Sequence, residues 1–534
     1  MTSLTRREAL KLAPLGAAAA LQPLHLNAQK AHAPVAVWDI FEAAFRATYS
    51  GNPYTDHSLR ATFTQNHRSV EVDGFCDGVS DGQANFKVRF MPDHPGTWDY
   101  TIHSDLTSLD GLQGSFAATP AEAGAHGLVS VRNAHHFAYA DGTPYFPFGT
   151  TCYAWTHQTE ELQQQTLKTL AASPFNKVRM CVFPKSYEYN HNDPEFFPFE
   201  RSSAGVNDYT RPNPAFFAHL EKRLADLRAL NIEADLILFH PYDSWGFASM
   251  PAEADELYLR YLIARVGCYR NVWWSLANEF DLMKAKSAQD FDRLFHVVEE
   301  KDPYNHLRSI HYSVTMYDYK KPWVTHASLQ TADFAAAPGY LASWNKPVVY
   351  DEVMYEGNLN RRWGNLSGDE MTHRFWLGVI NGCYVTHGET YLDPEYSLDE
   401  NATHTIFWSQ GGPLRGTSPK QIAFLRKLLE ETVHLKPGEH HARTGLTAGE
   451  KPYYLNATAV AADGKTAQTI LYYFDFHQPV WYEFPLPEGE FTFEWIDTLA
   501  MTITPKPGTH KGKTKLLLPG KPFQAVRFRT VTGK

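Results

Sequence analysis

Two carboxylates, each at the end of an apolar strand-like run, are the residues of this sequence best suited to chemistry. Glu279 comes directly after Asn278 at the end of the uncharged run 272–277, and Glu352 ends the run that starts at Val348. An ionised carboxylate at the end of a buried strand is costly unless it is paired or reactive. Retaining glycosidases use two carboxyl groups about 5–5.5 Å apart, one as nucleophile and the other as acid and base. The pair therefore predicts hydrolysis of a glycosidic bond.

Three acids compete for the nucleophile position at the second run. Side chains alternate along an extended strand, so Asp351 and Glu352 are expected on opposite faces. Glu352 is the last residue of the run, at the expected rim, and Glu356 lies four residues further on. We favour Glu352, then Glu356, then Asp351. The alternative role for Glu352 is an ion pair with an arginine such as Arg361 or Arg362.

Other polar and aromatic residues near the predicted strands are candidates for sugar binding. They are Asn278, Arg179, His240, Tyr153, His326, Trp408 and Glu389. Arg179 would hold Glu352 ionised, because a nearby cation lowers the pKa of a carboxylate, or it would form a structural salt bridge. Trp408 offers a flat ring for stacking on a sugar, although core packing explains it nearly as well. The two histidines would bind hydroxyl groups unless the fold itself satisfies them.

Eight apolar runs alternate with helical segments between about residues 127 and 433, which predicts an α/β fold with a parallel sheet. The runs are 145–153, 177–183, 234–240, 272–277, 307–313, 324–329, 348–352 and 384–387. This count matches one (β/α)8 TIM barrel, whose catalytic groups lie at the carboxyl ends of its strands. Strands four and seven, with Glu279 and Glu352, would then face each other across the mouth. A doubly wound sheet is the second possibility, but no Gly-rich phosphate loop follows the first strand.

Short runs that alternate apolar and polar residues flank this central segment on both sides. Gly, Pro, Asn and Asp separate the runs, as is typical of antiparallel β-sandwiches. We predict a barrel flanked by N-terminal and C-terminal β-sandwich domains. The expected boundaries are 1–33 for a signal peptide, 34–122 for the first sandwich, 123–434 for the barrel and 435–534 for the second sandwich.

The first residues are typical of a bacterial twin-arginine export signal. Arg6 and Arg7 precede an apolar Ala/Leu stretch that is too short to span a bilayer, and small residues follow near Ala28. An amphipathic helical start is the alternative. We expect a bacterial protein that is exported by the Tat route, cleaved near Ala28, and periplasmic or secreted.

Composition narrows the classes of partner. The formal net charge is −10 and the sequence has no basic run, which argues against nucleic acid or an anionic membrane as a partner. Five cysteines in 534 residues do not make a disulfide framework. The sequence has no CxxC pair and no HExxH motif, so we expect no essential metal and no cofactor. Carbohydrate is the expected partner, without membrane insertion, and the sequence makes no prediction of oligomeric state.

The pair of acids resembles the machinery of a known clan. Asn278-Glu279 after an apolar fourth strand, with a glutamate ending the seventh, is similar to the clan A (β/α)8 glycoside hydrolases that retain anomeric configuration. The resemblance implies that Glu279 is the acid and base, that Asn278 contacts the sugar 2-hydroxyl, and that Glu352 is the nucleophile.

Three motifs carry a closer resemblance. They are Phe148-Gly149-Thr150-Thr151, Leu238-Phe239-His240-Pro241-Tyr242-Asp243 and Asp351-Glu352-Val353-Met354-Tyr355-Glu356-Gly357. They resemble the apiosidase-like, collagen-binding-like hydrolases, and the flanking sandwiches resemble the DUF5060 and DUF5605 modules that accompany such barrels. In apiosidases the fourth strand carries an aspartate, whereas this chain has Glu279. The resemblance therefore does not extend to apiose as the sugar.

These observations predict an exported retaining glycoside hydrolase. It would cleave O-glycosidic bonds of a plant or bacterial polysaccharide or oligosaccharide by double displacement. The alternative is a non-catalytic carbohydrate-binding protein on a barrel scaffold. A polysaccharide lyase is disfavoured, because no Lys, Tyr or His base with a charge-neutralising cation stands out at the strand ends.

Overall fold

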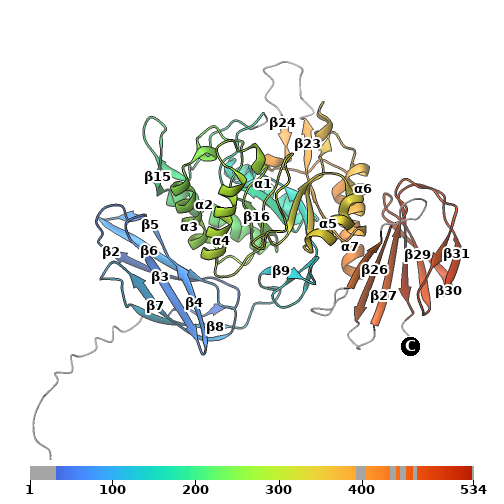
Figure 1. The fold of residues 1–534 in the computed structure, drawn as a ribbon, viewed down its shortest axis with the longest axis horizontal. Coiled ribbons are helices and arrows are strands. Elements are labelled where there is room, and N and C mark those ends of the chain that lie inside the picture. Colours follow the sequence, from blue (N-terminus) through green and yellow to red (C-terminus); the bar gives the residue numbers. More distant parts are fainter. Residues whose placement is uncertain are drawn as a thin grey trace, which may run out of the picture.

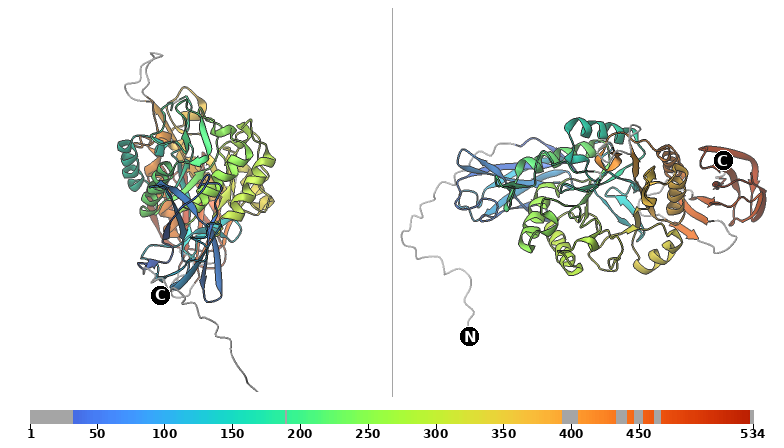
Figure 2. Two further views of the ribbon diagram at one scale, coloured as in Figure 1. Left: turned by 90° about the vertical axis from the view of Figure 1, so that its left-hand side faces the viewer. Right: turned by 90° about the horizontal axis from the view of Figure 1, so that it is seen from above.

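The chain folds into a central barrel with a β-rich unit on either side, laid out along the long axis of the molecule (Figure 1). The computed structural model describes residues 32–188, 190–392, 405–432, 441–445, 453–460 and 466–531. The predicted signal sequence lies almost entirely outside these residues, as does the predicted boundary at 434. The right-hand view of Figure 2 shows the same order, with the barrel between the N-terminal and C-terminal sheets.

Eight parallel strands form the barrel. They are β12 (Phe148–Thr151), β13 (Lys177–Cys181), β16 (Glu233–Ile237), β17 (Val272–Ser275), β18 (Arg308–Ser309), β19 (Ala327–Gln330), β20 (Val348–Glu352) and β22 (Tyr384–His387). Their order in the sheet is β18-β17-β16-β13-β12-β22-β20-β19. A parallel bridge between His311 and Ser328 joins the two ends of the sheet. This closure confirms the predicted (β/α)8 barrel and excludes the open doubly wound sheet.

Helices surround this sheet, so the strands are buried on both faces and their sequences are apolar runs rather than alternating ones. The helices are α1 (Glu160–Ala172), α2 (Pro214–Ala229), α3 (Ala252–Val266), α4 (Ala288–Lys301), α5 (Ala337–Trp344), α6 (Gly368–Ile380) and α7 (Ser418–Thr432). The connection from β18 to β19 has no helix. No helix in the described part of the chain is long and apolar enough to cross a membrane.

The N-terminal unit is a sandwich of two sheets. One sheet contains β1 (Val35–Ala36), β8 (Gln113–Thr119), β7 (Gly96–Ser104), β3 (Leu59–Gln65) and β4 (Arg68–Asp73) in that order; the other contains β2 (Phe41–Ala47), β6 (Gln83–Phe90) and β5 (Phe75–Ser80) in the order β2-β6-β5. Inward-facing aromatic rings hold the sheets together. Phe41 stacks on Phe116 with 4.0 Å between ring centres, and Phe63 stacks on Phe90 at 4.2 Å. The alternating sequence pattern follows from this one-sided burial.

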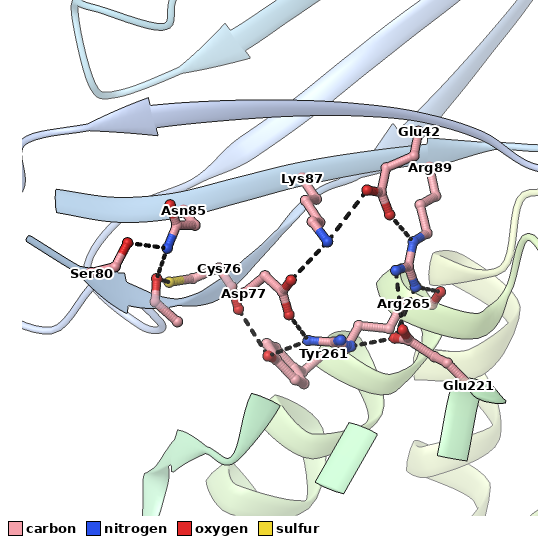
Figure 3. A network of polar contacts seen from close by, with 11 residues as sticks. Glu42, Cys76, Asp77, Ser80, Asn85, Lys87, Arg89, Glu221, Tyr261 and Arg265 are labelled. Atoms are coloured by element: carbon pink, nitrogen blue, oxygen red, sulfur yellow. Dashed lines mark hydrogen bonds and ion pairs between the residues drawn. The ribbon is translucent and has the colours of Figure 1, made fainter. Parts of the chain in front are cut away.

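A polar network joins this sandwich to the barrel helices α2 and α3 (Figure 3). Arg265 of α3 lies between an acid of each unit, 2.5 Å from Glu221 and 2.7 Å from Asp77. Arg89 of β6 reaches Glu221 at 2.8 Å and Glu42 at 2.9 Å. Lys87 of β6 is the third cation, 2.8 Å from Asp77 and 3.3 Å from Glu42. Three cations thus face three carboxylates, and the interface is matched in charge despite its burial.

A small sheet and the C-terminal unit complete the fold. The sheet β9 (Val129–Arg132), β10 (His136–Tyr139) and β11 (Pro144–Tyr145) covers the amino ends of the barrel strands, where Phe137 packs on Trp273. The C-terminal unit contains a six-stranded sheet of β25 (His441–Gly445), β26 (Tyr453–Val460), β27 (Thr466–Tyr473), β32 (Gln524–Thr530), β29 (Phe491–Asp497) and β30 (Thr502–His510), and the pair β28 (Trp481–Pro485) and β31 (Lys513–Leu517). It docks on α6, where Trp376 stacks on Tyr473.

Candidate active site

Glu279 lies just beyond the carboxyl end of β17 in a backbone conformation that is rare for its residue type. Its φ is 49° and its ψ is 54°, in the left-handed region. The next turn is fixed by Asp281, which accepts hydrogen bonds of 2.7, 2.8 and 2.7 Å from three consecutive backbone amides, 313–315. This turn directs the Glu279 carboxylate back over the barrel mouth. There its Oε2 accepts hydrogen bonds from the Tyr242 hydroxyl and from Asn278 Nδ2, the latter at 3.1 Å.

Glu352 reaches the same mouth because β20 is irregular at its end. The register against β19 pairs Leu329 with Tyr350 but Gln330 with Glu352, so Asp351 is an extra residue in β20. Such a bulge re-aims the side chains that follow it. Asp351 points into the barrel interior, 2.8 Å from Lys177 Nζ, while Glu352 accepts a hydrogen bond from the Tyr153 hydroxyl at the mouth.

The third competing acid, Glu356, is bound elsewhere. It is fully buried and accepts hydrogen bonds from the backbone amides of Thr417 at 2.7 Å and Ser418 at 3.3 Å. Glu389 likewise accepts from the amides of residues 415 and 416, both at 2.8 Å. These two carboxylates hold the loop that precedes α7. The predicted contact of Glu389 with sugar does not fit this placement, because its carboxylate faces backbone amides rather than the pocket.

A pocket of about 540 Å³ lies over the carboxyl ends of the strands and receives both remaining glutamates. Among the predicted site residues it is lined by Glu279, Glu352, Asn278 and Tyr153. Residues that were not predicted to belong to the site complete its wall: Lys185, Tyr187, Glu188, Tyr242, Ser313, Gln330, Thr331, Ala332, Val353, Met354, Tyr355, Trp363 and Phe407. Of these, Tyr242 in the motif after β16 and Lys185 just after β13 could have been considered from the sequence, but neither residue type alone indicates a functional site.

The two glutamates share an unfavourable electrostatic setting. Burial and the neighbouring Glu279 raise the pKa of Glu352 to about 7, against the opposing effect of Arg179. Two carboxylates that interact in a buried pocket do not both ionise readily, so the pair retains a proton up to about pH 7. In a retaining mechanism the general acid must be protonated while the neighbouring nucleophile is ionised. A pair of carboxyl groups that shares one proton meets this requirement.

Arg179 lies in the centre of the barrel beneath the pair. It is fully buried, and its NH2 donates to Asn278 Oδ1 at 3.3 Å. Its NH1 is 3.9 Å from Glu352 Oε1, and its Nε is 3.7 Å from Asp235 and 3.9 Å from Asp351. The guanidinium therefore connects the strand-four amide with the strand-seven carboxylate.

His240, His326 and Trp408 were also predicted to bind sugar, but they do not line the pocket. His240 Nε2 bonds to the backbone oxygen of Phe183 at 3.1 Å, and burial lowers the pKa of this histidine to about 3. His326 lies at the opposite end of the barrel, before β19, where its ring packs on Phe137 and Trp273. These placements correct the predictions for both histidines, because the fold buries both rings away from the pocket.

Trp408 is also a buried residue rather than a stacking platform. It is 2% exposed, and its Nε1 donates to Thr150 Oγ1 at 2.7 Å. The neighbouring Phe407 faces the pocket instead, together with Trp363, which is 37% exposed. The prediction therefore identified the correct segment, but Phe407 rather than Trp408 lines the pocket.

Among the residues that the structure describes, one group has ligand types that could hold a metal, namely the buried Glu356, His387 and Glu389. Thr150 Oγ1 accepts a hydrogen bond from Trp408 Nε1 at 2.7 Å and lies 3.1 Å from His387 Nδ1. His387 Nε2 lies 3.7 Å from the Glu389 carboxylate and 4.0 Å from that of Glu356. Because both carboxylates already accept backbone amides, these hydrogen bonds give the cluster a structural role behind the pocket.

Sequence families cover most of the chain. A family model described as "Apiosidase-like, catalytic domain" matches residues 131–435, and two domains of unknown function, DUF5060 and DUF5605, match residues 34–105 and 458–529. No curated protein sequence matches the chain.

Solved structures agree with these matches. The crystal structure of a candidate glycoside hydrolase from Bacteroides vulgatus ATCC 8482 has a TM-score of 0.84 and 38% identity, and the match covers 94% of this chain and 100% of that chain. A glycoside hydrolase family 5 protein from the same organism has a TM-score of 0.56 at 13% identity, covering 76% of this chain and 93% of that chain. At this lower identity the likeness shows the fold alone.

Proposed function

The chain belongs to the apiosidase-like family of catalytic domains, with DUF5060 and DUF5605 modules on either side as the sequence predicted, and from this we propose that it is a retaining glycoside hydrolase. Its structural neighbours are glycoside hydrolases. The observation that carries the proposal is the pocket pair: Glu279 from the end of strand four and Glu352 from the end of strand seven line one cavity. Each carboxylate accepts a hydrogen bond from its own tyrosine.

Glu352 acts as the nucleophile in the first displacement. Ionised, it attacks the anomeric carbon and forms a covalent glycosyl-enzyme while the bond to the leaving oxygen breaks. Arg179, 3.9 Å away, stabilises the ionised form of Glu352 and so opposes the effect of burial and of Glu279 on its pKa. The hydrogen bond from Tyr153 orients the attacking carboxylate.

Glu279 acts as the acid and then as the base. In the first step its proton passes to the leaving oxygen, and in the second it takes a proton from water, whose oxygen attacks the anomeric carbon and releases Glu352. Asn278 donates one amide hydrogen to Glu279, which leaves its second amide hydrogen for the sugar 2-hydroxyl. Trp363 and Phe407 supply ring faces on which a sugar can stack.

The proposal extends to substrate class and location. The substrate is a plant or bacterial polysaccharide or oligosaccharide, and the protein is exported through the Tat route to the periplasm or beyond. Arg6, Arg7 and the apolar stretch after them support export. A mature N-terminus near Ala28, measured by mass spectrometry on protein from a bacterial host, would bear this out, and an uncleaved chain in the cytoplasm would contradict it.

The test is a panel of aryl glycosides and plant and bacterial polysaccharides, followed by ¹H NMR of the first-formed anomer. We expect the first product to keep the anomeric configuration of the substrate, because two displacements each invert it. Glu352→Gln protein prepared in parallel controls for contaminating hydrolases. A first product of inverted configuration would overturn the proposed roles of the pair. Binding of these sugars without turnover would favour a carbohydrate-binding protein instead.

A further inference from the structure

Lys185 is a buried amine in the pocket that the two displacements do not use. It follows β13 after Val182, Phe183 and Pro184, is 6% exposed and lines the cavity. Its Nζ lies 4.0 Å from the ring centre of Tyr153 and 4.3 Å from that of Tyr242. A third ring, that of Tyr187, is 4.9 Å away. The ammonium contacts ring faces, and it forms no salt bridge to any acid among the described residues.

Two of these three rings carry the hydroxyls that hold the catalytic pair. Tyr153, which follows β12, donates to Glu352, and Tyr242, which follows β16, donates to Glu279. Lys185 is therefore the group that touches both halves of the pair through their tyrosines. A cation on a ring face is attracted by the ring and polarises the phenol, which strengthens the O–H as a donor.

The indirect contact suits the chemistry better than an ion pair would. A salt bridge between Lys185 and Glu279 would favour the carboxylate form and oppose its role as an acid. An ammonium held at the distance of a phenol ring keeps the orientation of both carboxylates without fixing the charge of either. Burial lowers the pKa of Lys185, whereas Glu279 and Glu352 raise it.

Other ionisable groups also face this amine, and any test of its charge has to account for them. They are Cys181 and Arg179 from β13, His240 after β16, His311 after β18, Glu279, Glu352 and the three tyrosines. Burial lowers the pKa of both histidines well below neutral, and burial raises that of Cys181 to about 12. Glu352 is thus the member of this group whose pKa lies near 7.

We propose that Lys185 is a positioning residue for the hydrolysis, which orients Glu279 and Glu352 through the hydroxyls of Tyr242 and Tyr153. The proposal rests on the proposed function for its effect on turnover. The juxtaposition on which it depends is independent of that function, because the amine, the two rings and the two carboxylates lie together without substrate.

Kinetics of Lys185→Met and Lys185→Arg give the first test. Met fills the volume of the lysine stem without a charge, and we expect kcat to fall roughly 10- to 100-fold, the scale on which misplaced catalytic groups lose rate, with KM little changed. The acidic limb of the pH profile of kcat/KM should move to higher pH, since removing a cation raises the pKa of nearby carboxylates. Arg keeps the cation, so the position of this limb should return towards that of the wild type. A change confined to KM would overturn the proposal and make Lys185 a substrate contact.

Double substitutions test whether the effect passes through the tyrosines. In a Tyr153→Phe or Tyr242→Phe background, one hydroxyl that Lys185 orients is already missing. We therefore expect Lys185→Met to cost less in kcat in each background than in the wild type, because residues that act as one unit are not additive. Full additivity in both backgrounds would contradict positioning through the rings.

A titration without substrate separates this proposal from the proposed function. ¹³C NMR of protein labelled at the glutamate carboxyls, assigned with Glu279→Gln and Glu352→Gln, follows the pair directly. The titration near pH 7 should move upward in Lys185→Met and stay in place in Lys185→Arg. If no glycoside is hydrolysed but the carboxyl titration moves in Lys185→Met, the proposed function is wrong. The coupling between Lys185 and the two carboxylates is then still supported. If wild-type hydrolysis is normal but the titration does not move in Lys185→Met, the positioning role fails; thermal unfolding of each variant checks that it is folded.

Discussion

Asp351 and Glu352 are neighbours in the chain, yet their carboxylates lie in opposite electrostatic surroundings. Below the mouth, Asp351 and Asp235 face Lys177 and Arg179, with Lys177 Nζ 2.7 Å from Asp235 and 2.8 Å from Asp351. Burial alone would raise the pKa of Asp351, but Lys177 and Arg179 hold it well below its usual range. This interior group has two cations for two anions, so its charges are matched.

At the mouth no cation among the described residues is in close contact with either carboxylate of the pair, because the Lys185 ammonium lies against tyrosine rings rather than against an acid. Glu279 and Glu352 face each other across the pocket, and Arg179 approaches Glu352 only at 3.9 Å. Burial and Glu279 raise the pKa of Glu352 to about 7. The polar interface of Figure 3 follows the interior pattern, since Arg89 and Arg265 each pair with two acids. Matched charges thus hold this fold together, and the mismatch marks the site where a proton can be moved.

The strongest test of this comparison removes one member of the unmatched pair. We expect Glu352→Gln and Glu279→Gln each to lower kcat/KM by roughly 10³-fold or more on a substrate with a poor leaving group, because each removes a group that reacts. The free energy of unfolding near pH 7 should stay the same or rise, since a like charge is lost. Sugar binding, measured by calorimetry, should persist.

Glu356→Gln is the matched control for this loss. Glu356 is a buried glutamate four residues from Glu352, but its carboxylate binds the loop before α7. We expect stability rather than chemistry to suffer in this variant. Activity losses of the same size in Glu352→Gln and Glu356→Gln at full folding would contradict the distinction between the two acids.

The matched group should show the opposite response. Asp351→Asn keeps the shape of the side chain but leaves Lys177 short of one carboxylate in the barrel interior. Breaking a buried ion pair on one side costs roughly 3–5 kcal/mol. Chemical denaturation of the variant at pH 7 should show a loss of this size. Ser328→Ala removes only one hydroxyl donor to the same carboxylate and should cost about 1 kcal/mol, so equal losses in the two variants would contradict the charge argument.

The barrel and its acid pair could be read from the sequence because the signals are local. Strands that are buried on both faces consist of continuous apolar runs. The eight runs, and the acids that end two of them, can therefore be identified from the sequence alone. The preference for Glu352 over Asp351 rested on its position at the end of the run, whereas the bulge in β20 that places both side chains could not be predicted from the residue types. Alternation along a regular strand would have pointed the two acids to opposite faces, whereas the bulge brings Asp351 to the interior and Glu352 to the mouth.

The incorrect predictions for Glu389 and His326, and the omission of Lys185, have a different explanation. Glu389 also follows an apolar run, but its partners are amides 26 and 27 residues further along the chain. His326 precedes its strand, so it lies at the wrong end of the barrel to meet a sugar in the pocket. Lys185 was missed because its proposed role depends on the rings of Tyr153 and Tyr242, which come from two other segments of the chain. Such contacts join residues that are distant in the chain, so they cannot be deduced from a single sequence.

The pH dependence of stability gives a finer test of the comparison. The pKa of Glu352 is about 7 in the folded protein against an ordinary value of 4.5. Between these values the folded state binds the proton and the unfolded state does not, so this carboxyl makes unfolding easier as pH rises. The cost is absent below about pH 4.5 and complete above about pH 7, where it reaches on the order of 3 kcal/mol.

Glu352→Gln removes this dependence, so the difference in unfolding free energy between the variant and the wild type should grow in favour of the variant from pH 4.5 to pH 7. Asp351→Asn should behave otherwise, because the native pKa of Asp351 lies well below its usual range and its contribution is already complete above the usual pKa of about 4. Its cost should therefore stay constant from pH 5 to pH 8. Urea denaturation at five or six pH values measures both differences. Parallel curves for the two variants would mean that the mouth pair is no more strained than the interior group, and the comparison on which the site assignment depends would fail.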